Sequence, residues 1–158
     1  APLLFGRGGE EALALAEAGV RFEIVPGVSS LSAVPAACGI PVTHRKLSSQ
    51  VTVVSGHDPG ALDYAALAAA PGTLVVFMGL AHLATIAQSL LEHGRDPATP
   101  AAVIASGTLP GQRSVFASLA EIAEAASGLE PPALVVVGEV VSLATSLSPR
   151  VDSLLARI

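Results

Sequence analysis

Three turns of small residues follow apolar or extended runs of the sequence and are the segments best suited to bind a small molecule. They are residues 26–30 (Pro-Gly-Val-Ser-Ser), 78–80 (Met-Gly-Leu) and 106–108 (Ser-Gly-Thr). Open α/β sheets bind ligands at such strand ends, because small residues leave the backbone amides and carbonyls within reach. Each turn alone is equally explained as an ordinary loop, so the ligand site is a hypothesis that depends on the three together.

A glycine-rich segment at residues 6–9 (Gly-Arg-Gly-Gly) precedes a helical pattern and could in principle bind phosphate at a helix start. Its spacing does not fit, because Glu11 stands where a dinucleotide fingerprint has glycine, and the Lys-Ser/Thr pair of a P-loop is missing. We therefore interpret the segment as a tight turn.

Cysteine, histidine and serine give no standard catalytic or metal-binding pattern. Cys38 has no charged neighbour in sequence to lower its pKa, which favours a buried, inert thiol. Hydrolase chemistry is disfavoured because no Gly-x-Ser-x-Gly nucleophile elbow occurs. We predict no metal site, since metal-ligand spacing is lacking among the four histidines, at positions 44, 57, 82 and 93.

Composition limits the class of protein. The 158 residues and 15.7 kDa suffice for a buried core, and one cysteine excludes an internal disulfide framework. Mean hydropathy is +0.65, but no run of eighteen apolar residues is free of charge, Gly or Pro, so we expect a protein of the cytoplasm rather than of the membrane. The formal charge of −5 argues against nucleic acid as the main partner, and a charged fraction of only 13% predicts that another subunit or domain covers apolar surface.

Apolar periodicity predicts alternating helices and strands, and therefore an α/β fold. The short link 107–111 predicts a hairpin, so that at least one strand pair is antiparallel and the sheet is mixed. The polar, proline-containing run 40–50 is interpreted as a connector between two lobes. The expected helices are 10–18, 30–38, 62–70, 81–93, 119–126 and 151–158, and the expected strands are 22–25, 51–54, 74–77, 101–105, 113–116 and 134–137.

Five strings in a fixed order resemble the tetrapyrrole methylase family, and within it the uroporphyrinogen-III C-methyltransferases. The resemblance covers nearly the whole chain. The strings are Phe-Gly-Arg-Gly-Gly-Glu-Glu at 5–11, Pro-Gly-Val-Ser-Ser at 26–30, Gly-Ile-Pro-Val-Thr-His-Arg at 39–45, Met-Gly-Leu at 78–80, and Gly-Thr at 107–108 with Gln-Arg at 112–113.

The resemblance implies a two-lobed α/β enzyme, usually a homodimer, that binds S-adenosyl-L-methionine between its lobes. Residues 1–43 would be the remainder of the N-terminal α/β domain, and residues 44–158 the C-terminal mixed-sheet α/β domain. The implied reaction methylates uroporphyrinogen III at two ring carbons and gives precorrin-2 for sirohaem and cobalamin synthesis. Such transfer from a sulfonium needs positioning and desolvation rather than a nucleophile–base pair.

The same resemblance implies roles for individual residues. The implied cofactor contacts are Leu4, Ser29, Ser30, Met78 and Gly107. The substrate carries eight carboxylates, for which the expected partners are Arg7, His44, Arg45 and Arg113.

No catalytic acid or base is assigned, because the family has that pair, and half of its cofactor site, upstream of the position of Ala1. Two alternatives therefore stay open at this point. One is a precorrin or cobalt-precorrin methyltransferase, and the other is an inactive ligand-binding or assembly fragment.

Overall fold

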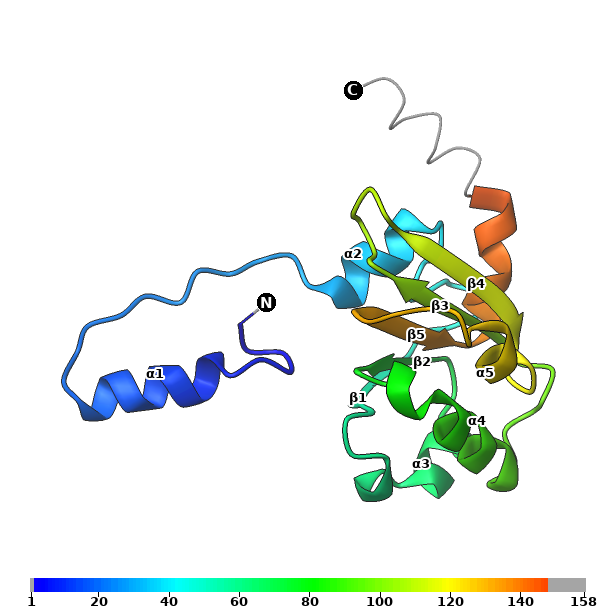
Figure 1. Ribbon diagram of the computed structural model, residues 1–158, viewed down its shortest axis with the longest axis horizontal. Coiled ribbons are helices and arrows are strands. Elements are labelled where there is room, and N and C mark those ends of the chain that lie inside the picture. Colours follow the sequence, from blue (N-terminus) through cyan, green and yellow to red (C-terminus); the bar gives the residue numbers. More distant parts are fainter. Residues whose placement is uncertain (1, 148–158) are drawn as a thin grey trace.

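A computed structural model describes residues 2–147 and contains a five-stranded mixed sheet with strand order β1-β2-β5-β3-β4 (Figure 1). β1 and β2 are parallel, whereas β5 is antiparallel to both of its neighbours, β2 and β3. β1, β2 and β3 therefore all end at the same edge of the sheet, where β5 begins. The strands are β1 (Val51–Ser55), β2 (Thr73–Phe77), β3 (Pro100–Ala105), β4 (Arg113–Ser118) and β5 (Ala133–Val137).

Both faces of the sheet are covered, and each cover buries its own apolar core (Figure 1). Alternate residues of a strand point to opposite faces, so Val76 and Val103 lie in one core while Val75 and Ile104 lie in the other. The helices of the first core are α3 (Tyr64–Ala69), α4 (Leu83–Glu92) and α5 (Ile122–Ala125). The second core is formed with α2 (Ser30–Ala37) and the short helix η3 (Glu139–Leu143). Two further single turns of 3₁₀ helix are η1 (Pro59–Ala61) and η2 (Leu80–His82).

Helix α1 (Gly8–Glu17) and the extended chain that follows it stand apart from this layered part of the chain (Figure 1). The helix forms where the sequence predicts it, with Glu10 and Glu11 in its first turn, but it buries no residue. The strand predicted at 22–25 is wrong. Those residues form exposed chain outside any strand, with Val25 70% accessible, because none of the described strands runs alongside to accept their backbone hydrogen bonds.

Most other predicted elements are confirmed to within a few residues. β3 and β4 pair antiparallel across the predicted hairpin. The helix predicted over 119–126 is shorter than expected, because the Leu119 and Ala120 amides donate to the Thr99 and Pro97 carbonyls and hold these residues outside α5. The helix predicted over 151–158 lies outside the described residues.

None of the helices described in the structure has the length and apolar character needed to cross a bilayer.

Candidate functional site

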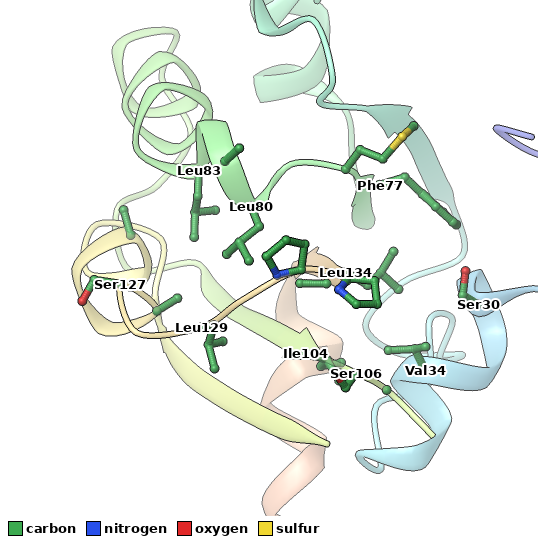
Figure 2. A pocket seen from close by; sticks show the side chains of 18 of the residues that line it. Ser30, Val34, Phe77, Leu80, Leu83, Ile104, Ser106, Ser127, Leu129 and Leu134 are labelled. Carbon is green, nitrogen blue, oxygen red and sulfur yellow. The ribbon is translucent and has the colours of Figure 1, made fainter. Parts of the chain in front are cut away.

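A cavity of the described chain lies at the edge of the sheet where β2 and β3 end and β5 begins (Figure 2). Strand register places Phe77, Leu134 and Ile104 next to one another across β2, β5 and β3, and all three line the cavity. Its volume is about 760 Å³, within the range typical of small-molecule sites. This is the edge at which ligands bind in open α/β sheets.

Apolar side chains make up most of the cavity wall (Figure 2). Leu83 comes from α4, Leu129 from the segment between α5 and β5, and Val34 from α2. The polar side chains of the wall are the hydroxyls of Ser30, Ser106 and Ser127, and among residues 2–147 no charged side chain lines it. The cavity is therefore suited to an uncharged, flat group that also uses backbone hydrogen bonds.

The turns after β2 and β3 hold unusual backbone conformations beside the cavity. Met78, Ser106 and Thr108 have φ values of 53°, 50° and 68°, in the left-handed region that non-glycine residues rarely adopt. Such conformations cost about 1–3 kcal/mol each and persist only where the surroundings enforce them. They concentrate at ligand sites, which supports a binding role for these two turns.

Gly107 is in the second of these turns because the backbone there approaches α2 too closely for a side chain. A Cβ atom at Gly107 would lie 2.5 Å from one methyl group of Val34 and 2.7 Å from the other. The loop backbone and α2 therefore pack directly against each other at the cavity wall.

Three of the residues predicted to contact a cofactor, Ser30, Met78 and Gly107, line this single cavity. Ser29 instead caps α2, with its hydroxyl oxygen accepting from the Leu31 amide at 3.2 Å. Leu4 is half-buried outside the cavity, but the ring of the next residue, Phe5, lies 5.2 Å from the ring of Phe77, centroid to centroid.

The four residues predicted to bind substrate carboxylates are not brought together and do not line the cavity. Arg7 forms an exposed ion pair with Glu10 on α1. His44 and Arg45 are exposed and lie near the start of β2, because Ser48, which pairs with His44, hydrogen-bonds to Thr73.

Arg113 begins β4, and its guanidinium donates to the Gly128 carbonyl at 3.1 Å. Gly128 lies between two residues of the cavity wall, Ser127 and Leu129. Arg113 therefore contacts the segment that forms this wall, although its own side chain does not line the cavity.

Cys38 ends α2 and is only 5% exposed. Burial raises the pKa of its thiol, and a hydrogen bond with Ser114 partly offsets that rise. The thiol is therefore neutral at physiological pH and unsuited to nucleophilic attack. Within residues 2–147, no group of three or more His, Cys, Asp or Glu side chains is placed to hold a metal ion.

Comparison with known proteins gives the family. The family model for tetrapyrrole (corrin/porphyrin) methylases matches residues 1–123. The chain belongs to this family. The resemblance inferred from the five strings and the predicted α/β fold class are thereby confirmed.

Two named relatives show which members of the tetrapyrrole methylase family the chain is similar to in sequence. The chain is 46% identical over 149 residues to a siroheme synthase of Edwardsiella ictaluri, covering 93% of this chain and 32% of that protein. It is 48% identical over 149 residues to an S-adenosyl-L-methionine-dependent uroporphyrinogen III methyltransferase of Methanosarcina barkeri, covering 90% of this chain and 58% of that protein.

A solved structure agrees with these sequence relatives. The uroporphyrin-III C-methyl transferase of Thermus thermophilus, complexed with S-adenyl homocysteine, matches with a TM-score of 0.77 and 44% identity, over 90% of this chain and 64% of that one. The chain thus spans between about a third and two thirds of the length of these relatives.

Sequence reasoning missed much of the wall of the cavity. Leu83, Leu129 and Leu134 come from three separate segments, and their shared position depends on strand order, which local periodicity does not encode. One usable signal was present at Pro131 and Pro132, directly before the apolar strand β5, because prolines mark the boundary of a strand at the same sheet edge.

Proposed function

We propose that this chain forms part of a uroporphyrinogen-III C-methyltransferase, which transfers methyl groups from S-adenosyl-L-methionine and yields precorrin-2. The observation that carries the proposal is the cavity at the ends of β2 and β3, which gathers Ser30, Met78 and Gly107 from three distant segments. The identity of 44–48% to proteins named for this activity supports the choice of substrate.

The cavity residues fit the nucleoside part of the cofactor. An adenine ring is flat and apolar on its faces, and Leu80, Leu83 and Pro132 offer apolar walls of the kind that such a ring packs against. Its polar edge needs hydrogen-bonding groups, which the peptide groups near Met78 and Gly107 can supply. When bound, the cofactor supplies an electrophilic methyl group on a positively charged sulfur.

The residues of the chain would contribute positioning and exclusion of water. The Met78 turn directly follows β2, and the Gly107 turn directly follows β3 and packs against α2, so their peptide groups lie where they could orient a bound nucleoside. An apolar wall without charged side chains excludes water, which strengthens electrostatic interactions within the site. A site of this kind lowers the barrier by alignment, without a protein nucleophile.

Substrate binding by Arg7, His44, Arg45 and Arg113 remains a proposal. Cationic groups can pair with the substrate carboxylates, and the net charge of −5 means that any attraction must be local. Association as a homodimer, location in the cytoplasm, a role in sirohaem and cobalamin synthesis, and division into domains at residue 44 are proposed on the same family grounds.

Filling the cavity tests the assignment. In the complete protein that carries this sequence, Ala84→Phe adds a ring to a residue of α4 that lines the cavity. Thr85→Phe makes a comparable addition at the next exposed position of the same helix, outside the wall. We expect calorimetry to show S-adenosylhomocysteine binding that Ala84→Phe weakens at least about tenfold and that Thr85→Phe leaves intact.

Product analysis tests the substrate. The unaltered protein, incubated with uroporphyrinogen III and methyl donor, should yield a product with two added methyl groups by mass spectrometry. A protein that binds S-adenosylhomocysteine but methylates only a precorrin would contradict the proposed substrate. Absence of binding would contradict the whole assignment and favour a non-catalytic module.

A further inference from the structure

The loop between β3 and β4, residues 106–112, carries the strained turn at the cavity and is held by few backbone contacts of its own. Within it, the Leu109 amide donates to the Ser106 carbonyl at 3.1 Å, and the Gln112 amide donates to the Leu109 carbonyl at 3.0 Å. The first bond closes a four-residue turn with Gly107 and Thr108 at its centre, where Thr108 has a left-handed φ of 68°. The Thr108 amide itself donates to neither carbonyl, so the orientation of its peptide group needs a further restraint.

The side chain of Gln112 supplies that restraint. Its Oε1 accepts from the Thr108 amide at 2.7 Å, and its Nε2 donates to Cys38 Sγ at 3.1 Å. An amide N–H can only donate, so the carboxamide oxygen must face Thr108 and the nitrogen must face the sulfur. Cys38 Sγ also lies 3.1 Å from Ser114 Oγ on β4, which fixes the position of the sulfur.

These contacts join the cavity loop to the C-terminal end and the middle of α2. Cys38 is the C-terminal cap of α2, Val34 packs against Gly107 from the middle of the helix, and Ser30 at its first position lines the cavity. Gln112 itself is half-buried and lies outside the cavity wall. It can therefore act on a ligand only through the loop.

We propose that Gln112 is a positioning residue, which holds the Thr108 amide so that the Gly107 peptide groups face a bound cofactor. This inference rests on the proposed function, because it takes the cavity to be the cofactor site. The Gln112 side chain keeps the loop backbone in the conformation that binds the cofactor. Binding therefore does not carry the free-energy cost of ordering the loop.

Removal of the carboxamide should be tolerated by the fold. Thr108 is exposed, so water can replace the acceptor for its amide once Gln112 is shortened. The variant Gln112→Ala in the complete protein is therefore expected to fold, with a melting temperature close to that of the unaltered protein. The matched control is Gln88→Ala, which deletes the same group from an exposed position where it donates to Glu92 Oε1 at 2.8 Å.

Calorimetry with S-adenosylhomocysteine is the principal test. We expect Gln112→Ala to raise the Kd about tenfold, corresponding to the loss of one well-placed hydrogen bond, and Gln88→Ala to leave it within twofold. In turnover assays, the KM for S-adenosylmethionine should rise in Gln112→Ala while the KM for the tetrapyrrole stays within twofold. A merely structural role for Gln112 would lower the melting temperature without that selectivity.

A second variant and a second measurement guard against misfolding. Cys38→Ala removes the partner of Nε2, together with the sulfur's contact to Ser114, but leaves the contact between Gln112 and Thr108 in place. It should therefore raise the Kd by about threefold, less than Gln112→Ala. Hydrogen–deuterium exchange of the peptide covering residues 106–112 should quicken in Gln112→Ala.

The outcomes separate the two proposals. If Gln112→Ala binds S-adenosylhomocysteine with a Kd within twofold of that of the unaltered protein, the positioning role is refuted and the proposed function stands. An unaltered protein that fails to bind S-adenosylhomocysteine would overturn both.

Discussion

Replacing Gly107 with alanine tests the close packing between the cavity loop and α2. The new Cβ would lie 2.5 Å and 2.7 Å from the methyl carbons of Val34 and 3.0 Å from its Cβ. Contacts under 3.0 Å cannot be kept, so the loop or the helix must shift. Overpacking of this kind costs about 1–3 kcal/mol. We expect Gly107→Ala to lower the free energy of unfolding by that amount and to weaken S-adenosylhomocysteine binding.

A double-mutant cycle with Val34→Ala isolates the cause. Val34→Ala alone removes two buried methyl groups and should cost about 1.6 kcal/mol. It also removes the two closest atoms and leaves only the contact at 3.0 Å. In that background, the added cost of Gly107→Ala should fall below about 0.5 kcal/mol, so the two substitutions are strongly non-additive.

Urea unfolding followed by circular dichroism measures all four proteins of the cycle. Gly111→Ala provides the control within the same loop, since a Cβ there meets no atom within 4 Å, and it should be near neutral. Equal costs of Gly107→Ala with and without Val34 would refute the packing argument. Normal binding by Gly107→Ala would mean that the loop does not shape the site.

Two further predictions concern regions outside the cavity wall. Arg95 donates to the Ala68, Ala70 and Gly72 carbonyls, which lie before β2 and away from its cavity end. Arg95→Ala should therefore lower the free energy of unfolding by about 1–3 kcal/mol in urea unfolding. Calorimetry should show no change in S-adenosylhomocysteine affinity. Burial raises the pKa of the Cys38 thiol in the folded protein. The buried thiol should therefore make its full contribution to the free energy of unfolding below the unfolded thiol's pKa of about 8.5. That contribution should be lost as pH rises through the folded pKa. Urea unfolding across that pH range should show no such decline in Cys38→Ala.

The part of the fold that could be predicted from sequence is the part in which local pattern and burial agree. The strands at Leu74–Phe77 and Leu134–Val137 are continuously apolar, as central strands covered on both faces must be. The segment at 22–25 is also mostly apolar, with Phe22, Ile24 and Val25, but it forms no strand. Extended structure needs a hydrogen-bonded neighbour, which apolar composition alone does not provide.

Among the described residues, the large apolar side chains that remain exposed are unevenly distributed. Exposed large apolar side chains concentrate in the N-terminal segment, on α1 and in the extended chain that follows it. The prediction that further protein covers apolar surface therefore applies chiefly to this segment, since the central strands β2, β5 and β3 are buried between the two cores.

The candidate site shows the same division between local and long-range information. Met78 and Gly107 could be singled out because turn chemistry is local, and each lies where a strand ends. The apolar wall could not be singled out in the same way. Leu83 and Leu129 line one cavity only because β5 lies between β2 and β3 in the sheet. Gln112 was visible only as part of a string, because its role depends on two partners, one of them 74 positions away at Cys38. A residue whose function is to join distant segments has no local sequence pattern, so it can be identified only from the structure.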